Sequence, residues 1–364
     1  MKEKVSLNLP KSIIDTHCHG RDLNQNHKST VLQTLKEAAS ANITSTFFMP
    51  NTDQPIINLP TLDLYLDYIY RACSKLKITD NQHVWFGATD NNLNACIDAL
   101  TYPNVIGIKV YPKAKSGETV TTGTIGVSDD TVMSMIISEC ASVGKAAAFH
   151  CDDPEIIQLD GYTKEAEYKY VAKIINIAKN ISGAKIVICH VSCRESAELI
   201  IQARKDGLNI VLELCPQYLW FDSQGTNWNT YLDPVYYHCY NNLRGPEDRK
   251  FLVRLLAEHD VFIIIGSDNA PHTRDEKLEK RYGGLPTNQH MVSVILTLAM
   301  QNGVSQKRIA DLLCYNAAKF FNIPVTDEKI RYILTETEDN KTYNNGFVEN
   351  PWRGSHLLIP SHWR

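Results

Sequence analysis

The sequence predicts an α/β protein whose parallel strands close into one (β/α)₈ barrel. Eight short apolar runs, rich in β-branched and aromatic residues, recur along the 364 residues, and each precedes a segment with helical character. Their nearly continuous apolar character is typical of a parallel sheet that is buried on both faces. Eight such units favour a closed barrel over an open, doubly wound sheet.

Strands and helices are expected to alternate along the chain. The strands are expected at residues 13–17, 44–50, 84–88, 105–111, 146–150, 185–190, 209–214 and 261–267. The helices between them are expected near 29–41, 62–76, 91–100, 129–143, 163–180, 194–206 and 246–259, with two more at 288–302 and 305–321 completing the outer ring.

The domain organisation follows from these elements. The barrel is expected over residues 1–324, and because its first strand begins at about residue 13, we expect no separate N-terminal domain. The stretch 325–364 is polar at first and then aromatic and apolar. It is too short for an independent domain, so we expect a C-terminal extension that packs on the barrel.

Composition narrows the class of protein. With 43% hydrophobic and 21% charged residues, the chain has the composition of a globular protein. The net charge is −4 and basic residues form no block, so we expect no nucleic-acid partner. No segment has the length and apolar character of a signal peptide or a spanning helix. We therefore expect a soluble, cytoplasmic protein without a membrane partner, whose ten cysteines are free thiols.

The first expected barrel strand ends in two histidines and an arginine. Side chains alternate along a strand, so His17, His19 and Arg21 point to one face. Nitrogen ligands suit zinc, nickel, iron or cobalt better than magnesium or calcium, and Arg21 adds a guanidinium fork for a carboxylate beside the metal. For this stretch alone, a surface strand with chance histidines is the alternative.

Other candidate ligands also lie at the ends of expected strands. His150 and His190 end the fifth and sixth strands, and Asp268 follows the eighth. In such a barrel the C-terminal strand ends surround the active site. Taken singly, each histidine could be a hydrogen-bonded structural residue, and Asp268 could cap a turn. Their convergence at one end of the barrel favours a metal centre.

Lys109 lies inside an apolar strand, where a lysine must be paired, deprotonated or modified. Reaction of its amine with carbon dioxide would give a carbamate, an anionic ligand that can bridge two metal ions. A water molecule that bridges two divalent ions is a hydroxide near neutral pH. Asp268 could accept the water proton and pass it to a departing nitrogen. This set of residues predicts hydrolysis of an amide or a related polar bond without a covalent enzyme intermediate.

The order and context of these motifs resemble the dihydroorotases of the amidohydrolase superfamily, over about residues 13–324. The matching stretches are HxHxR at 17–21, MPN at 49–51, KVYP at 109–112, the two single histidines, and DNAPH at 268–272. The resemblance implies a barrel that holds two divalent metal ions, expected to be zinc, bridged by carboxylated Lys109. It implies the metal ligands His17, His19, Lys109, His150, His190 and Asp268.

The resemblance also implies a reaction and its substrate contacts. The reaction is the reversible hydrolysis of L-dihydroorotate to N-carbamoyl-L-aspartate in de novo pyrimidine biosynthesis, by a bridging hydroxide with Asp268 as general base and acid. Arg21, Asn51 and His272 would bind the carboxylate of this small anion, and the family suggests a homodimer. The residue types agree, because an acidic ring needs a cationic fork beside the metal.

The sequence allows more than one role at the substrate site for two stretches. Thr121 and Thr122 lie in a polar segment rich in Gly, Ser and Thr that resembles the lid loop of dihydroorotases and would close on the substrate, the alternative being an ordinary flexible loop. Asn241 and Asn242 stand where many dihydroorotases have two prolines before Leu-Arg. The specificity of that corner is therefore open.

Two other functions fit the same motifs. A dihydropyrimidinase, hydantoinase or allantoinase would share the metal ligands but need not bind a ring carboxylate, so Arg21 and Asn51 favour a dihydroorotase. A catalytically inactive scaffold for another pyrimidine-pathway enzyme would be expected to have lost ligands, and none is missing from the sequence.

Overall fold

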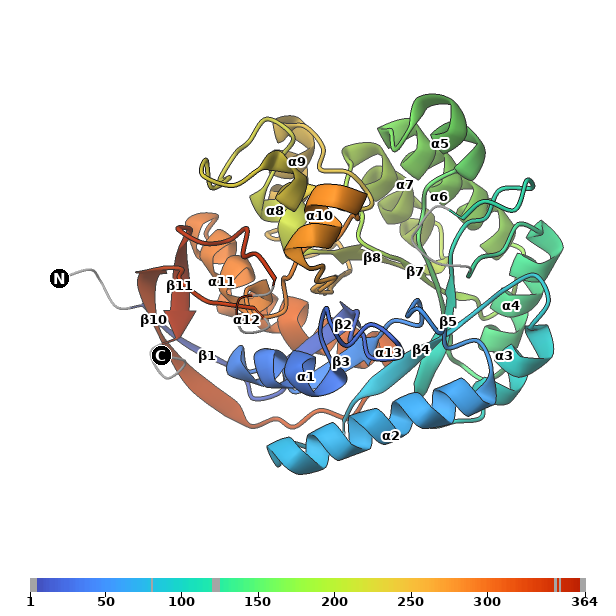
Figure 1. The fold of residues 1–364 in the computed structure, drawn as a ribbon, viewed down its shortest axis with the longest axis horizontal. Coiled ribbons are helices and arrows are strands. Elements are labelled where there is room, and N and C mark those ends of the chain that lie inside the picture. The colour runs from blue at the N-terminus through green and yellow to red at the C-terminus, as the bar shows by residue number, and fades with distance from the viewer. Residues whose placement is uncertain (1–4, 80, 120–124, 344–345, 347, 361–364) are drawn as a thin grey trace.

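Eight parallel strands form one sheet in the computed structural model, which describes residues 5–79, 81–119, 125–343, 346 and 348–360. The strand order is β2-β3-β4-β5-β6-β7-β8-β9, and helices surround the sheet (Figure 1). The first and last strands meet through hydrogen bonds from Asp268 N to His17 O (2.8 Å) and from His19 N to Asn269 O (2.9 Å). The expected (β/α)₈ barrel is confirmed.

The barrel strands are short and almost completely buried, because their apolar runs face the barrel interior on one side and helices on the other. In chain order they are β2 (Ile14–Cys18), β3 (Ser45–Phe48), β4 (His83–Gly87), β5 (Val105–Val110), β6 (Ala146–Phe149), β7 (Lys185–Ile188), β8 (Asn209–Leu214) and β9 (Ile263–Ile265). Phe47 and Trp85 point into the interior, where both rings pack edge-on against Phe321. The far end of the barrel is thereby filled.

The helices agree with the expected ones, with ends shifted by a few residues. They are α1 (Val31–Ser40), α2 (Leu59–Leu76), α3 (Leu93–Ala99), α4 (Asp130–Ser142), α5 (Pro154–Asp160), α6 (Lys164–Ala178), α7 (Arg194–Lys205), α8 (Pro216–Trp220), η1 (Pro234–Tyr237), α9 (Pro246–Leu255), α10 (Arg274–Lys280), α11 (Met291–Gln301), α12 (Gln306–Ala310), η2 (Asp311–Tyr315) and α13 (Asn316–Phe321). The short helices α5, α8 and α10 were not predicted. The expected helix 305–321 contains a π-helical turn, η2, of the kind that interrupts α-helices.

A second, three-stranded antiparallel sheet lies beside the barrel. It consists of β1 (Val5–Pro10), β10 (Lys329–Glu338) and β11 (His356–Pro360), with β10 in the centre (Figure 1). The first barrel strand, β2, begins at Ile14, close to the predicted residue 13, but β1 of the second sheet precedes it and was not predicted. The partner of β1 lies at the other end of the chain, so a local reading of the sequence could not find this strand.

The eighth barrel strand is shorter than predicted. It ends at Ile265 and not at residue 267, because Ser267 leaves the ladder and donates from its backbone N and its hydroxyl to the Asp15 carboxylate, at 2.7 and 2.6 Å. This turn carries the next residue, Asp268, to the barrel mouth.

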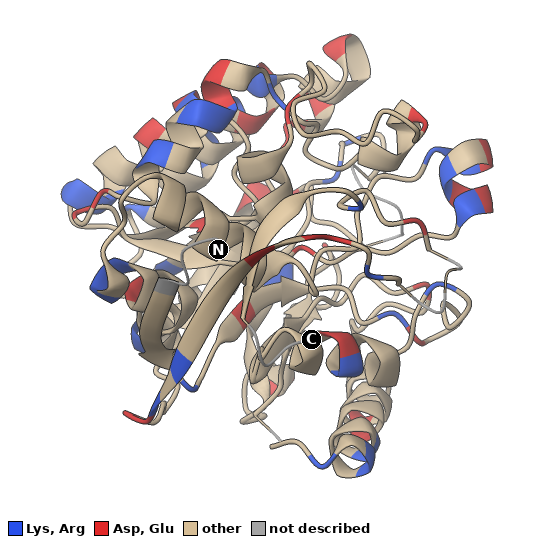
Figure 2. Cartoon of the chain, turned by 90° about the vertical axis from the view of Figure 1, so that its left-hand side faces the viewer, with Lys and Arg blue, Asp and Glu red and all other residues tan. Residues whose placement is uncertain are grey.

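The outer surface mixes both signs of charge. On the face that Figure 2 shows, acidic and basic residues both occur along the outer helices. Within the described part of the chain, none of the helices combines the length and the apolar character that a membrane crossing requires.

His83, at the start of β4, gives a test of the packing. Its ring packs edge-on against Phe47, and neither ring nitrogen has a hydrogen-bond partner among the described residues. Burial lowers the pKa of His83 from 6.5 to about 4. The unfolded chain therefore binds this proton more tightly, and the contribution of the neutral ring to stability, present above pH 6.5, is lost as the pH falls toward 4.

We expect His83→Leu to reduce the loss of stability between pH 7 and pH 4.5 by about 2–3 kcal/mol. Urea unfolding of both proteins at the two pH values measures this difference. His259→Leu, at an exposed position, is the matched control and should keep the wild-type pH dependence. The same pH dependence in His83→Leu and the wild type would contradict this account.

Candidate active site

The predicted site residues converge at the C-terminal ends of the barrel strands. A pocket of about 450 Å³, part of it open to solvent, lies there. Its walls include eight of the predicted residues, namely His17, His19, Arg21, Asn51, His150, His190, Asp268 and His272. Lys109 is buried nearby on β5, whereas Thr121 and Thr122 fall outside the described residues.

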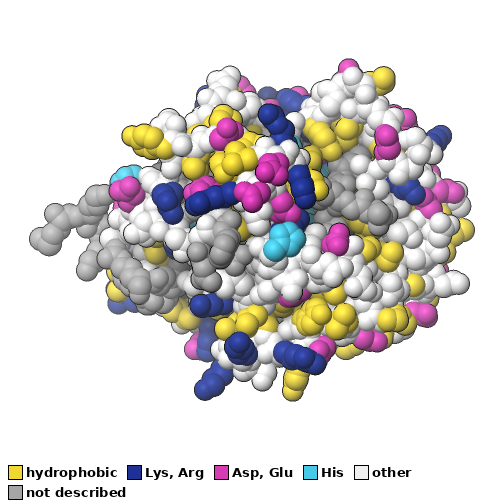
Figure 3. All heavy atoms as spheres, in the orientation of Figure 1, with side chains coloured by type: hydrophobic (Ala, Val, Ile, Leu, Met, Phe, Trp, Pro, Cys, Tyr) yellow, Lys and Arg dark blue, Asp and Glu magenta, His cyan; other side chains and the backbone are white. Residues whose placement is uncertain are grey.

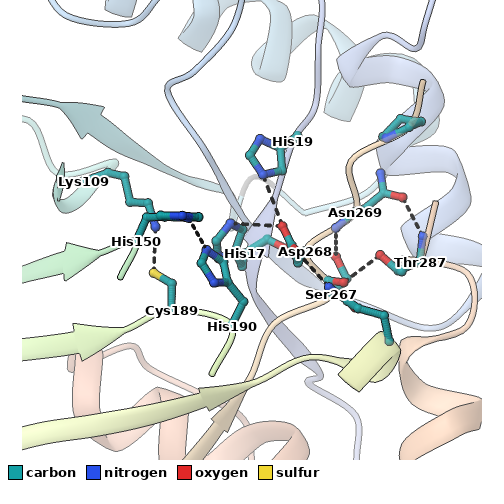
Figure 4. Close-up of polar contacts among 12 residues, drawn as sticks. His17, His19, Lys109, His150, Cys189, His190, Ser267, Asp268, Asn269 and Thr287 are labelled. Carbon is teal, nitrogen blue, oxygen red and sulfur yellow. Dashed lines mark hydrogen bonds and ion pairs between the residues drawn. The ribbon is translucent and has the colours of Figure 1, made fainter. Parts of the chain in front are cut away.

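His17, His19 and Asp268 form a compact group of possible metal ligands. Asp268 Oδ1 lies 3.4 Å from His17 Nε2 and 3.3 Å from His19 Nε2 (Figure 4). Atoms that bind a tetrahedral zinc ion at 2.0–2.1 Å lie about 3.3–3.4 Å from one another. The two distances to Asp268 Oδ1 match this spacing, and the three ligand atoms all lie within 4.8 Å of one another, so together they could hold a metal ion.

His17 is oriented by a carboxylate that the sequence analysis did not single out. Its Nδ1–H donates to Glu213 Oε2 at 2.8 Å, so the lone pair of Nε2 faces Asp268. Glu213 lies on β8 and also accepts from the Thr16 hydroxyl (2.6 Å) and from the backbone N of His190 (3.1 Å). A metal-binding histidine commonly donates its second nitrogen to such a carboxylate.

His150 and His190 form a second pair of nitrogen ligands. His150 Nδ1 lies 3.0 Å from His190 Nε2, and His150 Nε2 lies 2.8 Å from Asp152 Oδ2. His190 Nδ1 is buried without a hydrogen-bond partner among the described residues. Burial, with further contributions from His150 and Lys109, holds the pKa of His190 well below its ordinary value. The His190 ring therefore offers the neutral form that binds metal.

Lys109 is completely buried below this pair. Its Nζ lies 2.8 Å from Cys189 Sγ and 5.0 Å from the centre of the Tyr111 ring (Figure 4). Within the described part of the chain it forms no ion pair, and burial raises the pKa of the Cys189 thiol to about 12, so the thiol is neutral. A fully buried ammonium without an anionic partner is costly. The carbamate that the sequence predicts for Lys109 would not carry this cost.

Asp268 combines a ligand position with the properties of an acid and base. Burial raises its pKa to about 6, so its carboxyl can take up and release a proton near neutral pH. Gln217, at the start of α8, donates from Nε2 to Asp268 Oδ2 at 2.8 Å. This bond leaves Oδ1 directed toward the two histidines.

Arg21 and His272 form the opposite, cationic wall of the pocket. Arg21 is only 3% exposed, and it donates to Pro271 O from Nε (3.2 Å) and from Nη2 (3.0 Å). Its Nη2 also lies 3.2 Å from His272 Nε2. Burial lowers the pKa of Arg21 to about 10, which leaves the guanidinium charged at neutral pH. Asn51 lines the same pocket.

Three residues of the pocket hold a strained backbone. The φ angles of Arg21, His190 and Asp268 are +62°, +36° and +47°. A side chain in this left-handed region costs about 1–3 kcal/mol, and such strain is common at functional sites. The bonds from His190 N to Glu213 and from Asp268 N to His17 O offset part of this cost.

The corner around residues 240–245 borders the pocket through one of its residues. Asn241 is buried and donates to Cys151 O at 3.1 Å, and Tyr240 is the residue of this corner that lines the pocket. Arg244 points away to an ion pair with Glu167 at 3.1 Å.

Sequence reasoning missed three residues that hold the ligands in place. Glu213 was detectable, because it is a carboxylate inside the apolar run NIVLELC, in the same way that Lys109 is a lysine inside VIGIKVY. Asp152 follows His150 by two residues, a weaker signal. Gln217 had no recognisable sequence signal, because a single glutamine after a strand can have many roles.

Comparison with known proteins agrees with this geometry. The sequence profile of the Amidohydrolase family matches residues 11–326, so the chain belongs to this family and is a metal-dependent hydrolase. The dihydroorotase of Brevibacillus brevis is 25% identical, and the match covers 95% of this chain and 83% of that protein. The dihydroorotase of Caldicellulosiruptor saccharolyticus is 26% identical over 89% of this chain and 76% of that protein. The resemblance inferred from the motifs is confirmed.

Solved structures show the same fold. An L-hydantoinase (dihydropyrimidinase) from Arthrobacter aurescens superimposes with a TM-score of 0.79 at 20% identity, covering 98% of this chain and 83% of that one. A dihydroorotase from Saccharomyces cerevisiae in complex with 5-fluoroorotic acid gives a TM-score of 0.78 at 18% identity, covering 98% and 95%. At these identities the likeness concerns the fold.

We expect Glu213→Gln to weaken zinc binding about 10- to 100-fold, as other losses of an outer carboxylate do. The amide has nearly the same shape, but it removes the negative charge that holds His17 Nδ1–H. The zinc dissociation constant is measured by competition with a chelator, with circular dichroism as a check on folding. Glu247→Gln on the surface of α9 is the control, and equal zinc affinity in both variants would contradict the role of Glu213.

Proposed function

We propose that this amidohydrolase is a dihydroorotase, which hydrolyses L-dihydroorotate to N-carbamoyl-L-aspartate and catalyses the reverse ring closure in pyrimidine biosynthesis. The observation that carries the proposal is the fixed guanidinium of Arg21, which lines the same pocket as His17, His19 and Asp268. An acidic cyclic amide needs both features, a charged fork for its carboxylate and a metal for its carbonyl. The dihydroorotases that match most of the chain support the same substrate.

The ligand set fits two divalent ions, which we expect to be zinc. His17, His19 and Asp268 would hold one ion, and His150 and His190 the other, with carboxylated Lys109 as the bridge. When bound, such ions lower the pKa of a coordinated water and polarise a carbonyl group. The buried Tyr111 hydroxyl, which has no partner among the described residues, also lines the pocket as a donor for a ligand.

The chain's own groups then position the ring and move the proton. Arg21 and Asn51 bind the ring carboxylate and hold the scissile amide at the candidate metal ligands, and His272, also predicted to bind the carboxylate, acts through its contact with Arg21. Asp268 accepts a proton from the attacking water and returns it to the ring nitrogen as the C–N bond breaks, so the ring carbonyl becomes a carboxylic acid, which releases the second water proton to solvent and leaves the new carboxylate. Gln217 holds the other oxygen of Asp268 during both transfers.

A second candidate is another cyclic amidohydrolase, of the dihydropyrimidinase, hydantoinase or allantoinase type. The similarity of the fold to an L-hydantoinase favours it, whereas the buried Arg21 does not. The inactive scaffold is less favoured, because the pocket brings the candidate ligands together. The contacts of Thr121 and Thr122 with substrate, and the homodimer, stay predictions from the sequence.

A panel of four cyclic amides tests the proposed function. The metal-loaded wild type should hydrolyse dihydroorotate with a higher kcat/KM than dihydrouracil, hydantoin or allantoin. A preference for one of the uncharged rings would favour the second candidate. Bound metal without turnover of any of the four would exclude both.

Arg21→Met should keep the metal content and raise the KM for dihydroorotate about 100-fold or more, because two hydrogen bonds to a charged group are lost. Metal content is measured by mass spectrometry beside steady-state kinetics. Arg71→Met, at an exposed position of α2, should leave both unchanged. Loss of metal in Arg21→Met would contradict the assignment of Arg21 to substrate binding.

A further inference from the structure

The cationic wall of the pocket rests on the short helix α10. In Figure 1 this helix lies over the centre of the barrel, and Figure 3 shows acidic and basic side chains gathered in the same region. Glu276 of α10 forms a capping box with Thr273, accepting from Thr273 N at 3.2 Å while Thr273 Oγ1 accepts from Glu276 N at 3.4 Å. A capping residue needs no burial to do this. Glu276 is nevertheless only 7% exposed.

The burial of Glu276 serves contacts beyond the helix end. Its Oε1 lies 3.1 Å from Lys28 Nζ and 3.2 Å from His27 Nε2. Its Oε2 lies 3.5 Å from His272 Nδ1. Lys28 is itself buried and also lies 3.5 Å from His272 Nδ1. Glu276 is thus placed directly behind the imidazole that contacts Arg21.

The contacts of His272 allow two positions for its proton. If Lys28, 3.5 Å away, donates to Nδ1, the proton lies on Nε2 and faces Arg21. In the other arrangement the guanidinium of Arg21, which can only donate, bonds to His272 Nε2 as the acceptor, 3.2 Å from Nη2. The single proton of a neutral imidazole then lies on Nδ1, where Glu276 accepts it. Burial lowers the pKa of His272 well below its ordinary value, so the ring is neutral.

The opposite tautomer would break this arrangement. Without the carboxylate of Glu276, a proton on Nδ1 would face the Lys28 ammonium alone. The imidazole would instead carry its proton on Nε2, pointing at the Arg21 donor, and two donors would face each other. The guanidinium would lose one of the contacts that fix it at the pocket wall.

We propose that Glu276 is a positioning residue for substrate selection, which holds the His272 proton on Nδ1 and thereby fixes Arg21 for a ring carboxylate. Glu276 does not line the pocket, so it acts through His272. The inference rests on the proposed function, since it concerns the discrimination between a carboxylated ring and an uncharged one.

The first test is the preference of the metal-loaded enzyme for 5-fluoroorotate over 5-fluorouracil, two rings that differ by the carboxylate. Calorimetric titration gives the ratio of the two dissociation constants. Glu276→Ala should lower this ratio at least about tenfold, with the metal content unchanged. Thr273→Ala is the matched control, because it breaks the same capping box without touching His272, and it should stay within about twofold of the wild type. An unchanged ratio in Glu276→Ala, or an equal loss in both variants, would overturn the proposal.

The second test reads the tautomer directly. Long-range ¹H–¹⁵N correlation spectra of the imidazoles, assigned with His272→Gln, should show Nδ1–H in the wild type and in Thr273→Ala, and Nε2–H in Glu276→Ala. Nε2–H in the wild type would overturn the proposal without any variant. If the wild type shows Nδ1–H but binds the two rings with equal affinity, the proposed function is contradicted. The assignment of the His272 proton and its contact with Arg21 would still hold in that case.

Discussion

The closure of the barrel between β2 and β9 is the constraint on which the site depends. The buried carboxylate of Asp15 accepts hydrogen bonds from the backbone N and hydroxyl of Ser267 and, at 3.1 Å, from the backbone N of His17. Asp15 lies two residues before His17, and Ser267 lies one residue before Asp268, so these bonds adjoin the candidate ligands on both sides of the closure. Because side chains alternate along a strand, a shift of one residue would turn His17 and Asp268 to opposite faces. The hydrogen bonds that close the barrel between β2 and β9 therefore also set the positions of His17 and Asp268.

Around the pocket, several of the candidate metal ligands and substrate contacts are held by a second polar group. Glu213 and Asp152 orient His17 and His150, and Gln217 orients Asp268. At the carboxylate end, Glu276 stands behind His272 in the same way. Buried polar groups of this kind are stable only when they are satisfied together. The pocket is therefore a network in which the loss of an outer residue changes the direction of an inner one.

The sequence predicted the barrel and the ligand positions because both have local signals. Apolar runs mark the strands, and a histidine or an acid at the end of such a run is visible without a structure. The φ angles of His190 and Asp268 have no such signal, because partners distant in sequence impose them. Strand β1 was missed for the same reason. Thr273 and Glu276 could be read as a capping box, but only the fold shows that this glutamate also reaches His272.

The pairing of β1 with β10 has a consequence for synthesis of the chain. Val5 pairs with Leu334, and His17 and His19 meet Asp268 only after β9 has been made. While the ribosome extends the chain, β1 has no partner strand. The candidate ligands His17 and His19 also lack the third candidate ligand, Asp268, until β9 and the turn after it have been made. Contacts so far apart in sequence form slowly. If a metal ion is held by these three candidate ligands, it can stabilise only a nearly complete chain, and its binding would favour finished barrels over nascent ones.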